Sequence, residues 1–298
     1  VGGAEIHYLT KKQFVPILEN NPYIDRVWSY NDNFRELMNE IKYRHLDYII
    51  DLHNNLRSRR VKSALNLISF SFNKINFEKW MMVNLKRNRL PDVHIVDRYM
   101  DTIKAFDVTN DQKGLDYFIT DKDKKLTNEI RKQIPPEFIA LAIGANHFTK
   151  KLPSHKFIEI INRLKLPVVI LGGPTDQEEA KKIVSGSKGV VINATGKLSL
   201  HQSAHLIQIS KALITHDTGM MHVGAAFGKK VISIWGNTIP QFGMYPYLPH
   251  PQSRIFEVQG LNCRPCSKIG FKECPKSHFK CMVDQNTKGI ADYVNGIC

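Results

Sequence analysis

The sequence lacks any run of about 18 consecutive apolar residues, so it predicts no membrane-spanning helix. Its first residues, Val-Gly-Gly-Ala-Glu-Ile-His, also lack the basic and then apolar pattern of a signal peptide. Low-complexity segments and internal repeats are absent, and contents of 42% hydrophobic and 23% charged residues are ordinary for a globular protein. These absences exclude collagen, mucin, long coiled coils and wholesale disorder. The length of 298 residues corresponds to two domains of about 150 residues each.

Several nucleotide-binding and hydrolase motifs are missing as well. No G-x-G-x-x-G opens a helix, which argues against a dehydrogenase, and no G-x-x-x-x-G-K-[ST] is present, which excludes a P-loop ATPase. The absence of a G-x-S-x-G elbow removes the usual α/β-hydrolase. A single Asp-Thr-Gly occurs at residues 217–219, whereas aspartic proteases need two such motifs on β-domains.

Acidic residues are scarce relative to basic ones. The 28 Asp and Glu stand against 42 Lys and Arg, which gives a net charge of +14 and a pI near 9.5. Residues 57–90 hold nine basic residues against Glu78 alone, and residues 254–281 hold six against two acidic ones. Such a balance suits nucleic acid, an anionic membrane surface or a phosphorylated substrate. Because we find no aromatic stacking platform or groove-reading helix, we expect no nucleic-acid partner. Two solvated basic faces are the simpler alternative.

Short β-branched apolar runs alternate with amphipathic segments, which is typical of βαβ units and a parallel sheet. The expected strands are residues 4–9, 26–30, 48–53, 138–144, 167–173, 190–196, 212–218 and 230–236. Expected helices include residues 157–164, whose apolar positions follow the i, i+3, i+4, i+7 rule, and residues 199–210, with Ser199 as N-cap. A further short helix is expected at residues 288–298.

The alternation is interrupted between residues 108 and 136. Residues 109–114 are polar, and residues 122–134 have the pattern of a charged surface helix that ends at Pro135-Pro136. We therefore expect two α/β domains, one over residues 1–120 and one over residues 121–298.

Ligands of open α/β sheets bind at the carboxyl ends of the strands, so the residues that follow each strand are candidates for a site. Thr149 and Lys150 follow the expected strand 138–144 and suit a phosphate, because Lys supplies a point charge and Thr a hydroxyl donor. A solvated loop lysine is the alternative. Asp176 follows Gly172-Gly173, a pair that permits a tight turn and close approach of a ligand. Its carboxylate suits ribose hydroxyls, and Thr175 or Asp176 also suits the N-cap of a helix over 177–184.

The third strand end carries Asp217, Thr218 and Gly219, followed by a short apolar helix over residues 220–227. The free backbone N–H groups and the positive dipole end of this helix predict a diphosphate site. Asp217 stands beside it and suits sugar hydroxyls. His222 lies one turn into the helix and faces the same ligand, or else packs as a core histidine on the sheet.

Four of the five cysteines crowd into residues 263–281. An odd total without a secretion signal argues against a disulfide framework. Zinc at Cys263, Cys266, Cys274 and Cys281 is one interpretation, since thiolates at this spacing close a tetrahedron, and His278 could replace one of them. A reduced, cysteine-rich loop in the cytosol is the other.

Three stretches in this order resemble glycosyltransferase family 9, the family of ADP-heptose:lipopolysaccharide heptosyltransferases. They are T-K-K-L-P at 149–153, L-G-G-P-T-D at 171–176 and D-T-G-M-M-H at 217–222. Residues 48–58 are similar to the strand and turn of the family's amino domain, and residues 263–282 to a tail found in part of the family. The resemblance covers nearly the whole chain, and the order of the motifs is more specific than any one of them.

The resemblance implies a GT-B architecture: two Rossmann-like domains facing a cleft, the second binding the nucleotide-sugar and the first the acceptor. The family's pattern assigns substrate contacts to Thr149 and Lys150 (diphosphate), Asp176 (ribose), Leu198 (adenine), Asp217 (transferred sugar), and the backbone of Thr218 and Gly219 (phosphates). The implied function is an inverting, metal-independent glycosyltransferase without a cofactor. It would move a heptose or related sugar from an ADP-sugar to a lipopolysaccharide core acceptor, in the cytoplasm and in peripheral contact with the inner membrane. A basic polyanion-binding protein on an inactive GT-B scaffold is the alternative.

The beginning of the chain departs from the family's pattern. Residues 4–9 match the family's second strand, and Val1-Gly2-Gly3 the turn before it, so we expect the first βα unit to be missing. The Asp that serves as the family's general base lies in that unit. We therefore name no catalytic base, and Asp51 is a poor substitute on family grounds. A chain of this kind is expected to bind ADP and to transfer sugar poorly.

Overall fold

The computed structural model describes residues 3–30 and 33–298, and its contacts divide the chain into two units. Unit 1 contains Val1–Asn76 and Pro91–Gln112, and unit 2 contains Phe77–Leu90 and Lys113–Cys298. The predicted boundary after residue 120 did not anticipate that residues 77–90 belong with unit 2. The turn predicted at residues 1–3 falls partly outside the described residues. No helix among the described residues is long and apolar enough to cross a membrane.

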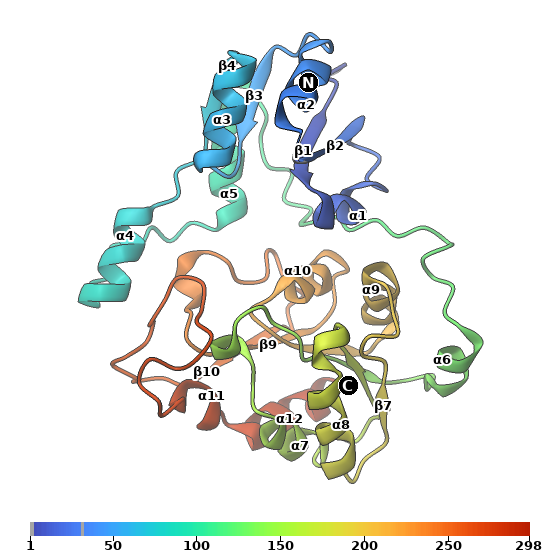
Figure 1. Cartoon of the computed structure of the whole chain (residues 1–298). Helices are drawn as coiled ribbons and strands as arrows, with labels where there is room; N and C mark the ends of the chain where they lie inside the picture. The colour runs from blue at the N-terminus through green and yellow to red at the C-terminus, as the bar shows by residue number, and fades with distance from the viewer. Residues whose placement is uncertain (1–2, 31–32) are drawn as a thin grey trace. The chain divides into compact units, whose positions relative to one another are not determined.

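Unit 2 is built on a six-stranded sheet in which all neighbouring strands are parallel (Figure 1). In spatial order the strands are β10 (Arg254–Glu257), β9 (Val231–Trp235), β8 (Ala212–His216), β5 (Ile139–Ala142), β6 (Val168–Leu171) and β7 (Val191–Asn193). Five of these strands are confirmed predictions, each somewhat shorter than expected. The edge strand β10 was missed because its sequence, Arg-Ile-Phe-Glu, has charged ends and only partial burial.

Helices cover both faces of this sheet, as Figure 1 shows. They are α7 (Ser154–Ile161), α8 (Gln177–Gly186), α11 (Lys280–Val283) and α12 (Thr287–Ile297) on one face, and α9 (Leu200–Ile209) and α10 (Gly219–Ala226) on the other. Along β5, Ile139 and Leu141 pack toward the first set, whereas Ala140 and Ala142 pack toward the second. Side chains of a strand alternate between faces, so burial on both faces produces the continuous apolar runs seen in the sequence.

Most helix predictions in unit 2 are confirmed, and the N-cap of α9 is confirmed in detail. The Ser199 hydroxyl accepts a hydrogen bond from the backbone N–H of Gln202, whose side chain reaches back to the Ser199 N–H. The charged helix expected at 122–134 is wrong over its first half, and only α6 (Asn128–Gln133) forms. Upstream, the Asp123 carboxylate accepts hydrogen bonds from Thr120, which closes a turn where the helix was expected to begin.

Unit 1 contains two separate parallel pairs of strands among its described residues, where a Rossmann-like domain would have one sheet. The pairs are β1 (His7–Lys11) with β2 (Arg26–Tyr30), and β3 (Tyr48–Asp51) with β4 (Ile68–Ser71). Strand β1 begins three residues later than predicted, and β4 was not predicted. Its helices are α1 (Val15–Leu18), α2 (Phe34–Lys42), α3 (Leu56–Leu65) and α5 (Ile95–Met100), with 3₁₀ turns at Lys12–Phe14 and Asp101–Phe106. One hydrophobic cluster, around Trp28, Leu37 and Ile41, packs α2 and α3 against β1 and β2.

Residues 77–90 form a short helical arm of unit 2. Helix α4 (Asn76–Trp80) continues into one π-helical turn, Met81–Leu85, and the chain then turns at Lys86 in the left-handed region. The Lys86 ammonium donates to the carbonyls of Cys263 and Pro265, at 3.3 and 2.6 Å. These two bonds, across 177 and 179 residues of sequence, fasten the arm to the cysteine-rich segment.

Candidate functional site

Three neighbouring strands of unit 2 end beside one another, and the residues that follow them form a cluster. Lys150 lies in the 3₁₀ turn Phe148–Lys150 after β5, Asp217 follows β8 directly, and Thr238 follows β9. Because the strand order is β9-β8-β5 and all pairs are parallel, their carboxyl ends share one edge of the sheet. The fold therefore brings together residues that stand up to 88 positions apart in the sequence.

The centre of the cluster is the Asp217 carboxylate, which is almost fully buried. Its Oδ2 lies 2.6 Å from the Lys150 Nζ and accepts a hydrogen bond of 2.7 Å from the Thr238 hydroxyl. The same ammonium donates to the Asp217 backbone carbonyl at 3.1 Å. Lys150 and Asp217 were both predicted as site residues, and the structure joins them as an ion pair. The Asp217 carboxylate thus neutralises the partly buried Lys150 ammonium, and an anionic ligand could replace the carboxylate as the partner of that ammonium.

The amino-terminal end of α10 opens directly beside Asp217. Thr218 is the N-cap, and its side chain makes no capping hydrogen bond to the first turn. Gly219 begins the helix and is exposed, and a Cβ placed there would meet no atom within 4 Å. The Met221 N–H donates to the Thr218 carbonyl at 3.1 Å, and a helix leaves its first N–H groups without intrahelical acceptors, so the positive end of this eight-residue helix has donors and space for a ligand. Together with Lys150, this arrangement suits an anion such as a diphosphate.

Thr149 is buried, and its hydroxyl is already engaged. It accepts a hydrogen bond of 2.8 Å from the Phe271 N–H and lies 3.3 Å from the Phe271 carbonyl. The hydroxyl therefore anchors the cysteine-rich segment to the loop that carries Lys150. A phosphate contact from Thr149 would require it to give up its donation to Phe271.

Asp176 is also engaged within the protein. Its Oδ1 lies 2.8 Å from the Lys151 Nζ, and its Oδ2 accepts a hydrogen bond from the Gly173 N–H at 3.0 Å. A Cβ at Gly144 would stand 2.7 Å from Oδ2, and one at Gly172 3.1 Å from it. The space that these glycines leave is therefore filled by Asp176, whereas we expected it to admit a ligand. Asp176 holds the N-cap position of α8 without making the side-chain capping bond that was predicted.

His216, the last residue of β8, positions the loop that carries Lys150. Its Nε2 accepts a hydrogen bond of 2.9 Å from the Leu152 N–H, two residues after Lys150. Complete burial, together with the nearby charge of Lys151, lowers the pKa of His216 from 6.5 to about 3. The imidazole is therefore neutral at ordinary pH, which is the state that this acceptor role requires.

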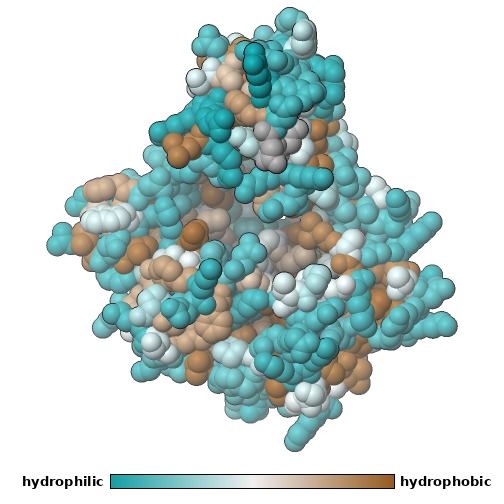
Figure 2. Space-filling view, in the orientation of Figure 1, coloured by the Kyte–Doolittle hydropathy of each residue, from teal (hydrophilic) through white to brown (hydrophobic). Residues whose placement is uncertain are grey.

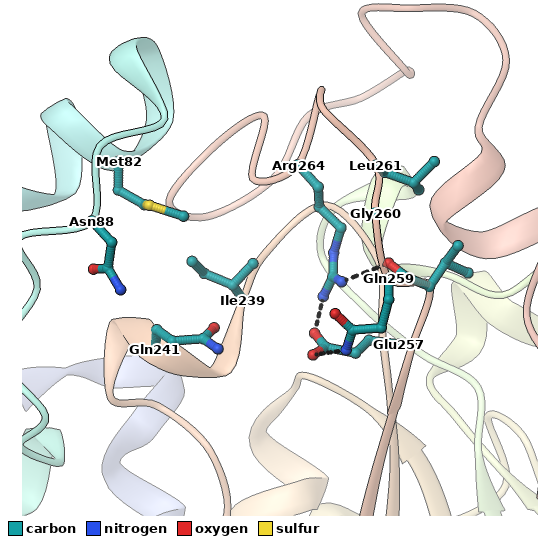
Figure 3. A pocket seen from close by; sticks show the side chains of 10 residues that line it. Met82, Asn88, Ile239, Gln241, Glu257, Gln259, Gly260, Leu261 and Arg264 are labelled. Atoms are coloured by element: carbon teal, nitrogen blue, oxygen red, sulfur yellow. Dashed lines mark hydrogen bonds and ion pairs between the residues drawn. The ribbon is translucent and has the colours of Figure 1, made fainter.

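Arg264 supports the cluster from the cysteine-rich segment. Its guanidinium donates to the carbonyls of Thr238 (2.8 Å), Val258 (3.1 Å) and Gly236, and it pairs with Glu257 at 2.5 Å. Figure 3 shows Arg264 and Glu257 meeting in the wall of a cavity of about 200 Å³. The cavity is also lined by Met82, Asn88, Ile239, Gln241 and residues 258–261. With all four contacts made to the protein itself, Arg264 fixes the backbone of residues 236–238.

Thr238, His216 and Arg264 were missed as site residues. Thr238 follows a predicted strand, so the strand-end argument applied to residues 236–238 could have found it. His216 stands one residue before the predicted Asp217, but only the fold shows what its ring contacts. No sequence signal marks Arg264, because its acceptors lie in two segments, residues 236–238 and 257–258, and only the fold brings these segments together.

Leu198 and His222, two further predicted site residues, differ in their surroundings. Leu198 is partly buried and packs against the apolar core on the α9 and α10 side of the sheet. His222 is half-buried in the first turn of α10. Their predicted contacts with adenine and sugar stay predictions.

The four clustered cysteines are free thiols. Cys263 Sγ lies 3.8 Å from His278 Nε2, yet no group of three His, Cys, Asp or Glu side chains within residues 3–30 and 33–298 is arranged to hold a metal ion. Burial raises the pKa of the Cys281 thiol to about 12 and also raises the pKa of Cys266. The arrangement of the side chains in the described part of the chain therefore gives the zinc interpretation no support.

Asp51, at the end of β3 in unit 1, is a structural carboxylate. Its Oδ1 accepts from the N–H groups of His53 and Asn54 at 3.0 and 2.7 Å, and its Oδ2 lies 2.9 Å from the Lys62 ammonium. Burial alone would raise the pKa of Asp51, but these bonds outweigh it and hold the pKa below the ordinary 3.8. A carboxylate with a lowered pKa is a weaker base, which agrees with its rejection as a substitute base.

Comparison with known proteins identifies the family and the fold of the chain. Lipopolysaccharide heptosyltransferase 2 of Escherichia coli is 24% identical over 50% of the chain, a match that spans 42% of the relative. Lipooligosaccharide heptosyltransferase 2 of Campylobacter jejuni is 24% identical over 80% of the chain and 79% of its own length. The solved structure of E. coli ADP-heptose lps heptosyltransferase II has the same fold, with a TM-score of 0.74 at 19% identity, over 100% of this chain and 90% of that one. A family profile matches residues 34–276, and the chain therefore belongs to glycosyltransferase family 9 (heptosyltransferase).

Proposed function

We propose that the protein is an inverting glycosyltransferase that transfers a heptose from ADP-heptose to the core of lipopolysaccharide. Family membership supports sugar transfer, and the names of the relatives in E. coli and C. jejuni support a lipopolysaccharide or lipooligosaccharide acceptor. The E. coli structure of the same fold is named for ADP-heptose, which supports the donor.

The observation that carries the proposal is the convergence of Lys150, Asp217 and the start of α10 at one sheet edge. The donor diphosphate would accept hydrogen bonds from the Lys150 ammonium and from the backbone N–H of Gly219. Asp217, released from part of its ion pair, would accept hydrogen bonds from hydroxyls of the transferred sugar, with Thr238 holding it in place. Asp176 and Leu198 are proposed for the ribose and adenine, respectively.

The chemistry follows from these positions. An acceptor hydroxyl attacks the anomeric carbon from the face opposite the diphosphate, the bond to the diphosphate oxygen breaks, and the configuration inverts. ADP leaves with an additional negative charge, and the acceptor proton passes to a base. Lys150, once part of its pairing with Asp217 is released, and the positive end of α10 would stabilise the charge that develops on the leaving diphosphate. We assign no cofactor to this step, and no metal.

The acceptor side of the proposal rests on charge. Helix α3 of unit 1 carries Arg57, Arg59 and Arg60 with no acidic residue, and its Leu56 is exposed. A phosphorylated lipid core has the complementary charge. A polyanion-binding protein on an inactive scaffold would share this basic helix but would not need the Lys150–Asp217 pair, so the donor cluster favours the enzyme.

Calorimetry with ADP tests the donor site. Lys150→Ala should weaken ADP binding about tenfold or more, because a charge-assisted hydrogen bond worth about 1.5–3 kcal/mol is lost. Lys181→Ala is the matched control, since Lys181 is exposed on α8 and pairs with Glu178 of the same helix. Equal ADP affinity in wild type and Lys150→Ala would refute the proposed donor site.

A further inference from the structure

The helical arm of residues 77–90 exposes large apolar side chains in a way that the donor site does not explain. Phe77, Trp80 and Leu85 are 64%, 52% and 50% exposed. Phe77 and Trp80 are one turn apart on α4, and their rings stack with centroids 6.4 Å apart. Figure 2 shows hydrophobic atoms over this arm among hydrophilic ones. We call these three side chains the apolar ridge.

Basic residues accompany the apolar ridge in the sequence of the arm. The arm contains Lys79, Lys86, Arg87 and Arg89 against the single acidic residue Glu78. Arg87 and Arg89 are exposed and follow the π-helical turn directly. The ridge and the charge therefore occupy one short stretch of surface.

The arm is held rigidly enough to present this surface. Met81 is buried, and the Lys86 ammonium donates to the carbonyls of Val83, Cys263 and Pro265. The interior of unit 2 therefore does not bury the apolar ridge, and an exposed apolar patch of this kind marks an interaction surface.

We propose that the arm docks on the surface of an anionic phospholipid bilayer. In this arrangement the rings of Phe77 and Trp80 and the Leu85 side chain enter the headgroup and acyl boundary, while Arg87 and Arg89 contact lipid phosphates. Tryptophan prefers that boundary because its ring is apolar and its N–H is polar, and clustered basic residues are drawn to an anionic leaflet. The choice of a lipid surface over a protein rests on the proposed function, whose acceptor is carried by a lipid.

The three tryptophans make the test specific. Trp28 and Trp235 are 6% and 1% exposed, so a change in tryptophan emission on adding vesicles reports Trp80. With phosphatidylglycerol–phosphatidylcholine vesicles we expect a blue shift and protection from acrylamide quenching, both weakening as salt screens the charge. Pure phosphatidylcholine vesicles should give neither. Trp80→Phe should abolish the spectral change while sedimentation with the anionic vesicles persists.

Two sets of variants separate the ridge from the charge. The triple variant Phe77→Ser, Trp80→Ser, Leu85→Ser should partition at least about tenfold more weakly, because three apolar side chains no longer leave water. Arg87→Gln with Arg89→Gln should weaken binding roughly fivefold for each charge removed. The matched control is Val190→Ser, a 65% exposed apolar residue of the same unit, which should bind as wild type does.

Calorimetry with ADP on the same proteins distinguishes this proposal from the proposed function. Ridge variants should bind ADP as wild type does, and Lys150→Ala should bind vesicles as wild type does. Absence of binding to the anionic vesicles, or equal binding by the triple variant, would overturn the membrane proposal and leave the donor site standing. Vesicle binding without any ADP binding would contradict the proposed function and would still support the membrane proposal.

Discussion

The two units of this protein bury their strands to very different degrees. In unit 2, the strands β5, β6, β8 and β9 are buried at every position, between two apolar clusters that lie on opposite faces of the sheet. In unit 1, β2 and β3 each have one buried residue, and β1 and β4 have none. The hydrophobic cluster of this unit contains five buried side chains. The comparison indicates that the cluster of Lys150, Asp217 and Thr238 is supported by the better-packed unit.

Truncation of one isoleucine in each unit tests this difference, and it has the largest expected effect. Ile170 is the third residue of β6 and fully buried, whereas Ile50 is the third residue of β3 and only partly buried. Ile170→Ala should lower the free energy of unfolding by about 3–5 kcal/mol, because it leaves a cavity in a closed core. Ile50→Ala should cost about half as much or less. Urea unfolding measures both, and equal losses would contradict the comparison.

Acid sensitivity should also differ between the units. The folded pKa of His216 is about 3 against an ordinary 6.5, so below pH 6.5 the unfolded chain binds a proton that the folded chain does not. Unit 2 should therefore lose about 1.4 kcal/mol of stability per pH unit as pH falls from about 6 to 4. The lowered pKa of Asp51 in unit 1 acts in the same direction, but only as pH falls below about 3.8.

His216→Gln keeps an acceptor for the Leu152 N–H and removes the titration. Its stability should change less between pH 6 and pH 4 than that of wild type, by roughly 1–3 kcal/mol over the interval. His155→Gln changes an exposed histidine of the neighbouring helix α7 and should leave the wild-type pH profile unaltered. An unchanged profile in His216→Gln would show that another group is responsible.

Substitution of the carboxylates at the carboxyl ends of β8 and β3, Asp217 and Asp51, has the smallest expected effect and the most specific one. Asp217→Asn in unit 2 releases Lys150 from its ion pair, so ADP binding should be retained or strengthened. The affinity for ADP-heptose relative to ADP should fall about tenfold, since a hydrogen bond to a charged group is lost on the sugar. Asp51→Asn in unit 1 should leave this ratio as it is in wild type. Calorimetry with ADP and with ADP-heptose measures this ratio of affinities. A wild-type ratio in Asp217→Asn would show that Asp217 does not contact the sugar.

Strands were predicted correctly from the sequence where burial on both faces of the sheet requires a run of mostly apolar residues, as in Val168–Leu171 and Ala212–His216. Prediction failed where a segment depends on distant partners. The edge strand β10 pairs with β9 on one side only, and the first half of the helix expected at 122–134 gives way to a turn closed by Thr120 and Asp123. Local pattern carries no information about either pairing.

The sequence by itself determined the α/β class, the helix caps such as Ser199, and the candidates Lys150, Asp217 and Gly219 at strand ends. These follow from periodicity and from residue chemistry over a few neighbouring positions. Only the tertiary structure decided that Lys150 and Asp217 form an ion pair, that Thr238 and Arg264 hold that pair in place, and that residues 77–90 belong to unit 2. The physical reason is that strand order and long-range hydrogen bonds join residues tens to nearly two hundred positions apart, which no local propensity encodes.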